Sequence, residues 1–167
     1  MSHDTASRWR TFAAPSTGPR NQLIVALDVT ALTPALRMAR QLRGVVRTVK
    51  IGSALFTACG PDAIRHLRTL GFEIMLDLKF HDIPSTVAKS CRAAVAHRVS
   101  LMTLHAAGGA EMLSAAVEGV RAEAKRLRVP RPRLLAVTVL TSVPARRASS
   151  MTRRVVELAK IARRSGC

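Results

Sequence analysis

Short apolar runs that end in a polar residue recur along this chain, and a helix-like stretch follows each of them. The runs cover residues 23–28, 49–52, 72–77, 101–105 and 134–141. Strands that are apolar nearly throughout and alternate with amphipathic helices are typical of a parallel sheet covered by helices. The sequence therefore predicts an α/β fold with strands near 22–28, 47–52, 73–79, 101–106 and 133–141.

The clearest predicted helix follows Gly108 and Gly109. Its apolar residues recur at helical spacing, at positions 112, 113, 116, 117 and 120. Glu111 falls in the first turn and Arg126 near the end, where the helix dipole favours these charges. A last helix is predicted near 152–165, with Gly166 as its C-cap.

The segment 77–84, Asp-Leu-Lys-Phe-His-Asp-Ile-Pro, places three charged residues within six positions at the end of the third predicted strand. Because side chains alternate along a strand, Asp77 and Lys79 point the same way and can contact each other. A lysine held between two carboxylates stays protonated and can deliver a proton to a carbanion. Active sites of parallel α/β folds lie at the carboxyl ends of strands, where this segment falls. A surface cluster of salt bridges explains the segment, taken alone, equally well.

The motifs in their order resemble the orotidine 5′-monophosphate decarboxylase family. They are Leu27-Asp28, Lys50-Ile-Gly, Asp77-x-Lys79-x-x-Asp82-Ile-Pro, His105-Ala-Ala-Gly-Gly and Leu140-Thr-Ser, and they run from about Gln22 to the last residue. The Asp-x-Lys-x-x-Asp core alone marks a wider superfamily, so a sugar-phosphate decarboxylase or aldolase is the alternative enzyme. The Ile-Pro and His-Ala-Ala-Gly-Gly segments point to the orotidylate branch.

The resemblance implies decarboxylation of orotidine 5′-phosphate to UMP in pyrimidine biosynthesis, with no metal and no cofactor. It implies that Lys79 donates the proton to C6 of the pyrimidine. Asp77 would crowd the substrate carboxylate and hold Lys79 in place. Lys50 would bridge Asp77 and the ribose. Asp82 would reach into the site of a partner subunit, because members of the family are homodimers with shared sites.

The resemblance also implies a set of substrate-binding residues. Asp28 would accept a hydrogen bond from the ribose, and Thr141 would contact the amide edge of the pyrimidine. Ile83 and Pro84 would shape the pocket, while His105 would lie near the ribose or orient its neighbours. A preorganised cation where negative charge develops is the available source of transition-state stabilisation in such a site.

The length of the chain departs from the family's TIM (β/α)8-barrel. A closed eight-stranded barrel usually needs about 250 residues, whereas this chain has 167. We therefore expect residues 22–167 to form a partial barrel of about five βα units, as in a fragment. In the family, the βα units after the fifth bind the substrate phosphate. We therefore expect the isolated 167-residue chain to be inactive.

The chain is strongly basic, with 27 Lys and Arg against 10 Asp and Glu and a formal net charge of +17. This balance ordinarily suggests nucleic acid as a partner. Aromatic residues make up only 3%, however, and there is no Tyr. The chain therefore offers few side chains on which nucleic-acid bases could stack. The arginines are also scattered along the sequence. We expect no nucleic-acid partner. A non-catalytic basic remnant that binds anions is the alternative outside the enzyme class.

Residues 1–21 hold Ser, Thr, Pro and Arg without apolar periodicity and are predicted to be a disordered basic leader. No segment approaches the roughly 20 apolar residues of a membrane span. The three cysteines lack metal-site spacing and are odd in number, which favours a reducing cytoplasm. Cys91 is expected in the core with Val87 and Ala94. His66, His81 and His97 are expected to be ordinary surface or loop histidines.

Overall fold

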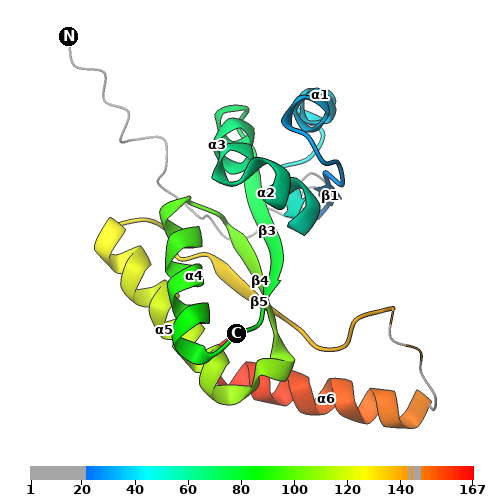
Figure 1. Ribbon diagram of the computed structural model, residues 1–167, viewed down its shortest axis with the longest axis vertical. Coiled ribbons are helices and arrows are strands. Elements are labelled where there is room, and N and C mark those ends of the chain that lie inside the picture. The colour runs from blue at the N-terminus through cyan, green and yellow to red at the C-terminus, as the bar shows by residue number, and fades with distance from the viewer. Residues whose placement is uncertain (1–21, 143, 145–147) are drawn as a thin grey trace.

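The computed structural model describes residues 22–142, 144 and 148–167. Its sheet has five strands, which pair in parallel in the order of the sequence (Figure 1). They are β1 (Ile24–Ala26), β2 (Thr48–Gly52), β3 (Glu73–Phe80), β4 (Leu101–His105) and β5 (Arg133–Val137). The predicted parallel α/β fold is thereby confirmed. The predicted leader, residues 1–21, lies outside the described residues.

Helices lie between successive strands, and one more follows the last strand. They are α1 (Leu32–Leu42), α2 (Ser53–Cys59), α3 (Pro61–Thr69), α4 (Pro84–Ala96), the short 3₁₀ helix η3 (Ala106–Gly108), α5 (Gly109–Leu127) and α6 (Ala148–Arg164). Figure 1 shows α1 to α3 grouped near β1, and α4 beside α5. Helix α6 contacts α5 and η3 and extends beyond the other helices. None of the helices in the described part of the chain combines the length and apolarity of a membrane span.

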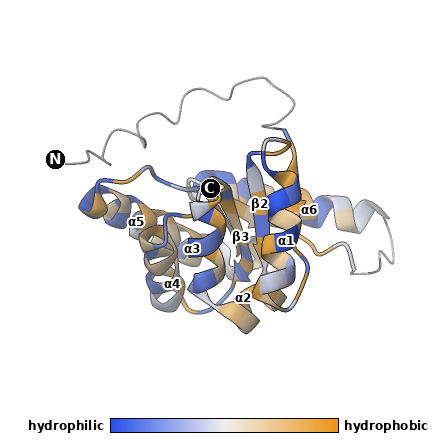
Figure 2. Ribbon diagram, turned by 90° about the horizontal axis from the view of Figure 1, so that it is seen from above, coloured by the Kyte–Doolittle hydropathy of each residue, from blue (hydrophilic) through white to orange (hydrophobic). Residues whose placement is uncertain are grey.

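The hydrophobic core lies between the helices and one face of the sheet. Alternate strand residues are buried there, as the period of two along a strand requires; they are Val49, Ile51, Ile74, Leu76, Met102 and Leu104. Figure 2 shows that the helices carry both hydrophobic and hydrophilic residues, as expected when one side of each faces the core. The intervening strand residues, which include Lys50, Asp77 and Thr103, point to the opposite face of the sheet.

The buried position of Cys91 and the C-cap at Gly166 are confirmed. Cys91 is fully buried in α4 with Val87 and Ala94. Gly166 has a φ of 88°, in the left-handed region that glycine adopts without steric cost. Its N–H donates to the Arg163 carbonyl at 3.2 Å, and this closes the last turn of α6.

The predictions for the fifth strand and the last helix were partly wrong. The strand was expected to extend to residue 141 but ends at Val137. Its apolar sequence continues to Leu140, yet β4 ends at His105, which pairs with Val137. A longer β5 would therefore have no β4 residues to pair with. The last helix begins at residue 148, earlier than the predicted 152.

The outer strands of the sheet are open among the described residues. There, β1 pairs only with β2, and β5 pairs only with β4. Ile24 on β1 is 44% exposed and Leu135 on β5 is 47% exposed. Apolar side chains on an unpaired strand favour association with another polypeptide segment.

Candidate functional site

The pairing of β3 with β4 is irregular at the charged segment. Between its pairings with Met102 and Leu104, β3 has three residues, 77–79, where β4 has one, Thr103. Such a bulge bends the strand and changes the direction of its side chains. Within it, Lys79 has a φ of 49°, which is uncommon for a residue other than glycine. The end of β3 is therefore shaped by the bulge as well as by strand alternation.

Four polar side chains surround or adjoin the carboxylate of Asp77, and they come from the first four strands or the residues that follow them. Lys79 Nζ lies 2.9 Å from Asp77 Oδ1, and Lys50 Nζ lies 3.3 Å from Oδ2. The Thr103 hydroxyl donates to Asp77 Oδ1 at 2.9 Å. Asp28 Oδ1, just beyond β1, lies 3.8 Å from Lys50 Nζ. The predicted contact between Asp77 and Lys79 is thus present, and Lys50 and Asp28 extend it into a charged array.

Asp77 is ionised in this array. Only 9% of the residue is exposed, and this burial by itself raises the pKa of its carboxyl group. Hydrogen bonds from Lys79, Thr103 and Lys50, together with the charge of Lys79, outweigh burial and hold the pKa of Asp77 below its ordinary value. The buried carboxylate is thereby compensated by two cations and one neutral donor.

Asp82, Ile83 and Pro84 lie beyond the charged array. Asp82 is exposed in the loop after β3, and its Oδ1 accepts from the Ile83 N–H at 2.6 Å. Among the described residues, no hydrogen bond or ion pair joins Asp82 to Asp77 or Lys79. Ile83 is 64% exposed, and Pro84 is the first residue of α4. Asp82 and Ile83 thus lie in the loop between β3 and α4, and Pro84 begins that helix.

His105 lies at the end of β4, beside the charged array. Its ring centroid is 5.3 Å from that of His81, in the loop after β3. Burial, and then the nearby His81 and Lys79, lower the pKa of His105, so the neutral imidazole is favoured. His81 is exposed, as predicted, but this ring contact was not predicted. Thr141, expected to end the fifth strand, lies exposed in the turn after it.

Thr103 was not identified from the sequence. The residue is 1% exposed, and besides donating to Asp77 its hydroxyl accepts from the Lys79 backbone N–H at 2.9 Å. One signal was available, because Thr103 is the single hydroxyl-bearing residue in an otherwise apolar run, two positions before His105. Alternation along β4 places both residues on the face of the sheet that bears Asp77.

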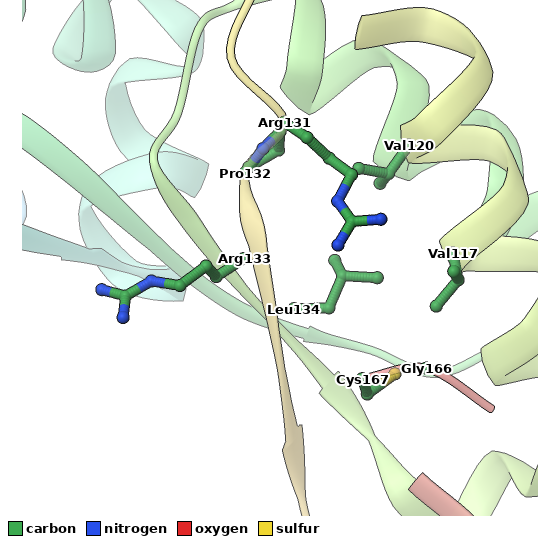
Figure 3. A pocket seen from close by; sticks show the side chains of 8 residues that line it. All are labelled: Val117, Val120, Arg131, Pro132, Arg133, Leu134, Gly166 and Cys167. Carbon is green, nitrogen blue, oxygen red and sulfur yellow. The ribbon is translucent and has the colours of Figure 1, made fainter. Parts of the chain in front are cut away.

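A separate cavity of about 310 Å³ lies beside the start of β5 (Figure 3). Its walls are Val117 and Val120 of α5, residues 131–134, and Gly166 and Cys167 after α6. Arg131 extends along it toward Val120 (Figure 3). None of the charged residues of the array lines this cavity, and it adjoins the amino end of β5. The array at the carboxyl ends of the strands is therefore the better candidate for chemistry.

Comparison with known proteins identifies relatives along most of the chain. Residues 21–166 match the Orotidine 5′-phosphate decarboxylase / HUMPS family. An orotidine 5′-phosphate decarboxylase of Parasynechococcus marenigrum is 49% identical over 131 residues, which are 77% of this chain and 53% of the relative. One from Pelobacter propionicus is 46% identical over 153 residues, 88% of this chain and 62% of the relative. The chain thus spans little more than half the length of these curated relatives.

Solved structures show the same fold. The crystal structure of an orotidine 5′-phosphate decarboxylase from Lactobacillus acidophilus has a TM-score of 0.75 at 36% identity, over 87% of this chain and 68% of that one. An uncharacterized conserved protein from Geobacillus kaustophilus has a TM-score of 0.77 at 35% identity, over 86% of this chain and 69% of that one. The five βα units match part of the TIM barrel of orotidine 5′-phosphate decarboxylase, as predicted.

We expect Asp77→Asn to reduce the acid sensitivity of the fold. Because the pKa of Asp77 is below its ordinary value of 3.8, its carboxylate stabilises the native state above that pH, and the contribution is lost as the pH falls through the lowered pKa. Urea unfolding at about pH 6 and about pH 3 should show a smaller loss of stability in the variant than in the wild type.

Asp62→Asn is the matched control, because Asp62 is exposed and pairs with Arg65 within the same helix. Its acid sensitivity should resemble that of the wild type. Equal acid sensitivity in all three proteins contradicts the stabilising role assigned to the Asp77 carboxylate.

Proposed function

Because the chain belongs to the orotidine 5′-phosphate decarboxylase / HUMPS family, we propose that it carries the charged part of a site that converts orotidine 5′-phosphate to UMP without metal or cofactor. The observation that best supports this function is the buried Asp77 carboxylate held between Lys50 and Lys79. Such an array offers a fixed cation next to a fixed anion, and direct decarboxylation can use both.

Lys79 is the proton donor in this proposal. When the bond between C6 and the carboxyl group breaks, CO₂ leaves and the electron pair remains on C6. The Lys79 ammonium stabilises this negative charge and transfers a proton to it. Its side chain is 35% exposed, so a bound pyrimidine can reach Nζ. The contact with Asp77 fixes Nζ before the reaction begins, and no reorganisation is needed at that moment.

Asp77 has two roles in this proposal. It orients both ammonium groups through its separate oxygen atoms, Oδ1 for Lys79 and Oδ2 for Lys50. Its negative charge would also lie near the substrate carboxylate, where repulsion favours departure of CO₂. A lowered pKa keeps Asp77 charged for both roles at neutral pH.

The remaining residues bind the substrate. Lys50 and Asp28 serve the ribose hydroxyls, since Lys50 Nζ lies between the two carboxylates and the Asp28 side chain is 71% exposed. The exposed Asp82 reaches the site of a second subunit in a homodimer. Ile83 and Pro84, with His105 and Thr141, complete the walls around the pyrimidine and ribose.

We expect Lys79→Ala to abolish turnover in a completed barrel. The test protein joins residues 22–167 to the part of the Pelobacter propionicus relative that this chain does not span. Loss of the proton donor should lower kcat by roughly 10²–10⁴-fold or more, measured as the loss of orotidine 5′-phosphate absorbance. The fold, monitored by circular dichroism, should be retained.

Lys89→Ala is the matched control, because Lys89 is an exposed lysine of α4. Near-wild-type turnover in Lys79→Ala, or loss of wild-type activity on addition of a chelator, contradicts the assignment. Turnover of a keto-sugar phosphate in place of orotidine 5′-phosphate assigns the chain to the other branch of the superfamily.

Mixing two inactive variants of the completed barrel tests the role of Asp82. We expect Lys79→Ala chains and Asp82→Ala chains to regain activity when they exchange subunits, because some hybrid sites then hold both wild-type residues. Turnover after mixing measures this recovery. If subunits exchange, as shown by mass spectrometry, and no activity returns, Asp82 does not act across the dimer.

Residues 1–167 alone should show no measurable decarboxylation. The outer strands β1 and β5 are open among the described residues. In this proposal the residues that bind the substrate phosphate and position the ring come from the part of the relatives that residues 1–167 do not span. Lost phosphate binding lowers the rate as well as the affinity. The same absorbance assay compares this chain with the completed barrel, and equal turnover by the two overturns the expectation.

A further inference from the structure

We propose that Thr103 is a positioning residue that fixes Asp77 and Lys79 relative to each other and thereby sets the location of the Lys79 ammonium. The inference rests on the proposed function for its consequence in catalysis. In the structure, the buried Thr103 hydroxyl group contacts both of these residues of β3.

Thr103 occupies the only β4 position opposite the bulge of β3. It stands where β4 has one residue against residues 77–79 of β3. In a regular parallel ladder the backbone groups of both strands pair with each other, and a bulge interrupts that pairing. The Thr103 side chain is buried at this interruption, with 1% of the residue exposed, so water has little access to replace it.

The direction of both hydrogen bonds follows from the groups involved. The Lys79 backbone N–H can only donate, so Thr103 Oγ1 accepts from it at 2.9 Å. The ionised Asp77 carboxylate can only accept, so the hydroxyl hydrogen of Thr103 points to Oδ1, also at 2.9 Å. One hydroxyl thus uses its hydrogen and a lone pair to join the backbone of Lys79 to the side chain of Asp77.

The backbone contact supports an uncommon conformation. Lys79 has a φ of 49°, and residues in this region persist when their surroundings hold them there. Thr103 Oγ1 gives the Lys79 N–H a partner in that conformation. Since Lys79 extends from this backbone to place Nζ 2.9 Å from Asp77 Oδ1, the hydroxyl acts on the start of the lysine side chain.

The side-chain contact sets the rotation of the Asp77 carboxylate. Oδ1 accepts hydrogen bonds from the Thr103 hydroxyl and from Lys79 Nζ. Oδ2 therefore remains for Lys50 Nζ, which lies 3.3 Å away. Thr103 contributes a neutral donor, so it holds the carboxylate without adding a third positive charge to the array. The two ammonium groups therefore take fixed places on either side of Asp77.

Three variants of the 167-residue chain test this role. Thr103→Val keeps the shape of the side chain and removes both hydrogen bonds, whereas Thr103→Ser keeps both. Thr48→Val is the matched control, because Thr48 begins β2 at the amino end of the sheet, away from the array. Hydrogen exchange of the Lys79 amide and a ¹³C NMR titration of the Asp77 carboxyl group are measured in each.

We expect the Lys79 amide to exchange about tenfold faster in Thr103→Val, because one hydrogen bond that protects it is lost. The titration midpoint of Asp77 should move upward, because the carboxylate loses one donor. Thr103→Ser should restore both values, and Thr48→Val should leave them unchanged. Unchanged exchange and an unchanged midpoint in Thr103→Val overturn the proposal. An unprotected Lys79 amide in the wild type does so as well, even if Thr103→Val does not fold.

The completed barrel separates this inference from the proposed function. There, Thr103→Val should lower kcat for orotidine 5′-phosphate more than it raises KM, and Thr103→Ser should recover kcat. If the wild-type completed barrel decarboxylates nothing, the proposed function fails. In that case, hydrogen exchange of the Lys79 amide and titration of the Asp77 carboxyl group still decide whether Thr103 positions these two residues.

Discussion

A carboxylate with little access to water is the interaction on which the rest of the site depends. Asp77 is 9% exposed, and a buried charge is tolerated only when partners replace the water that it loses. Lys79, Lys50 and Thr103 replace that water at 2.9–3.3 Å. Because each partner comes from a defined place on β2, β3 or β4, the charge of Asp77 ties the carboxyl ends of three strands together.

The parallel sheet makes this convergence possible. In-register pairing brings Gly52 of β2 next to Asp77 of β3, and the strand ends with polar residues therefore meet at one edge. Asp28, Lys50, Asp77 and Lys79 all belong to the first three βα units. The charged array is thus contained in a chain that spans little more than half the length of its curated relatives. Among the described residues, β1 and β5 are the two outer strands of this sheet.

Sequence reasoning was most accurate where a local pattern decides the structure. Apolar runs located all five strands, and Gly166 located the end of α6. It was least accurate for the end of β5, where Leu140 extends the apolar pattern but β4 offers no further pairing partner. Alternation correctly indicated the contact of Asp77 with Lys79, although a bulge and a left-handed Lys79 take part in making it.

The sequence by itself determined the α/β order and the contact of Asp77 with Lys79, because both follow from local patterns along the strands. The order of the motifs along the chain indicated the family, and the resemblance to that family then placed Lys50 and Asp28 in the array. Only the tertiary structure decided the role of Thr103, which lies 24 and 26 positions from Lys79 and Asp77. It likewise brought His81 to His105. Contacts of this kind depend on the register between strands and on a local bulge. Register is set by how whole strands and helices pack, so no short segment of the chain encodes it.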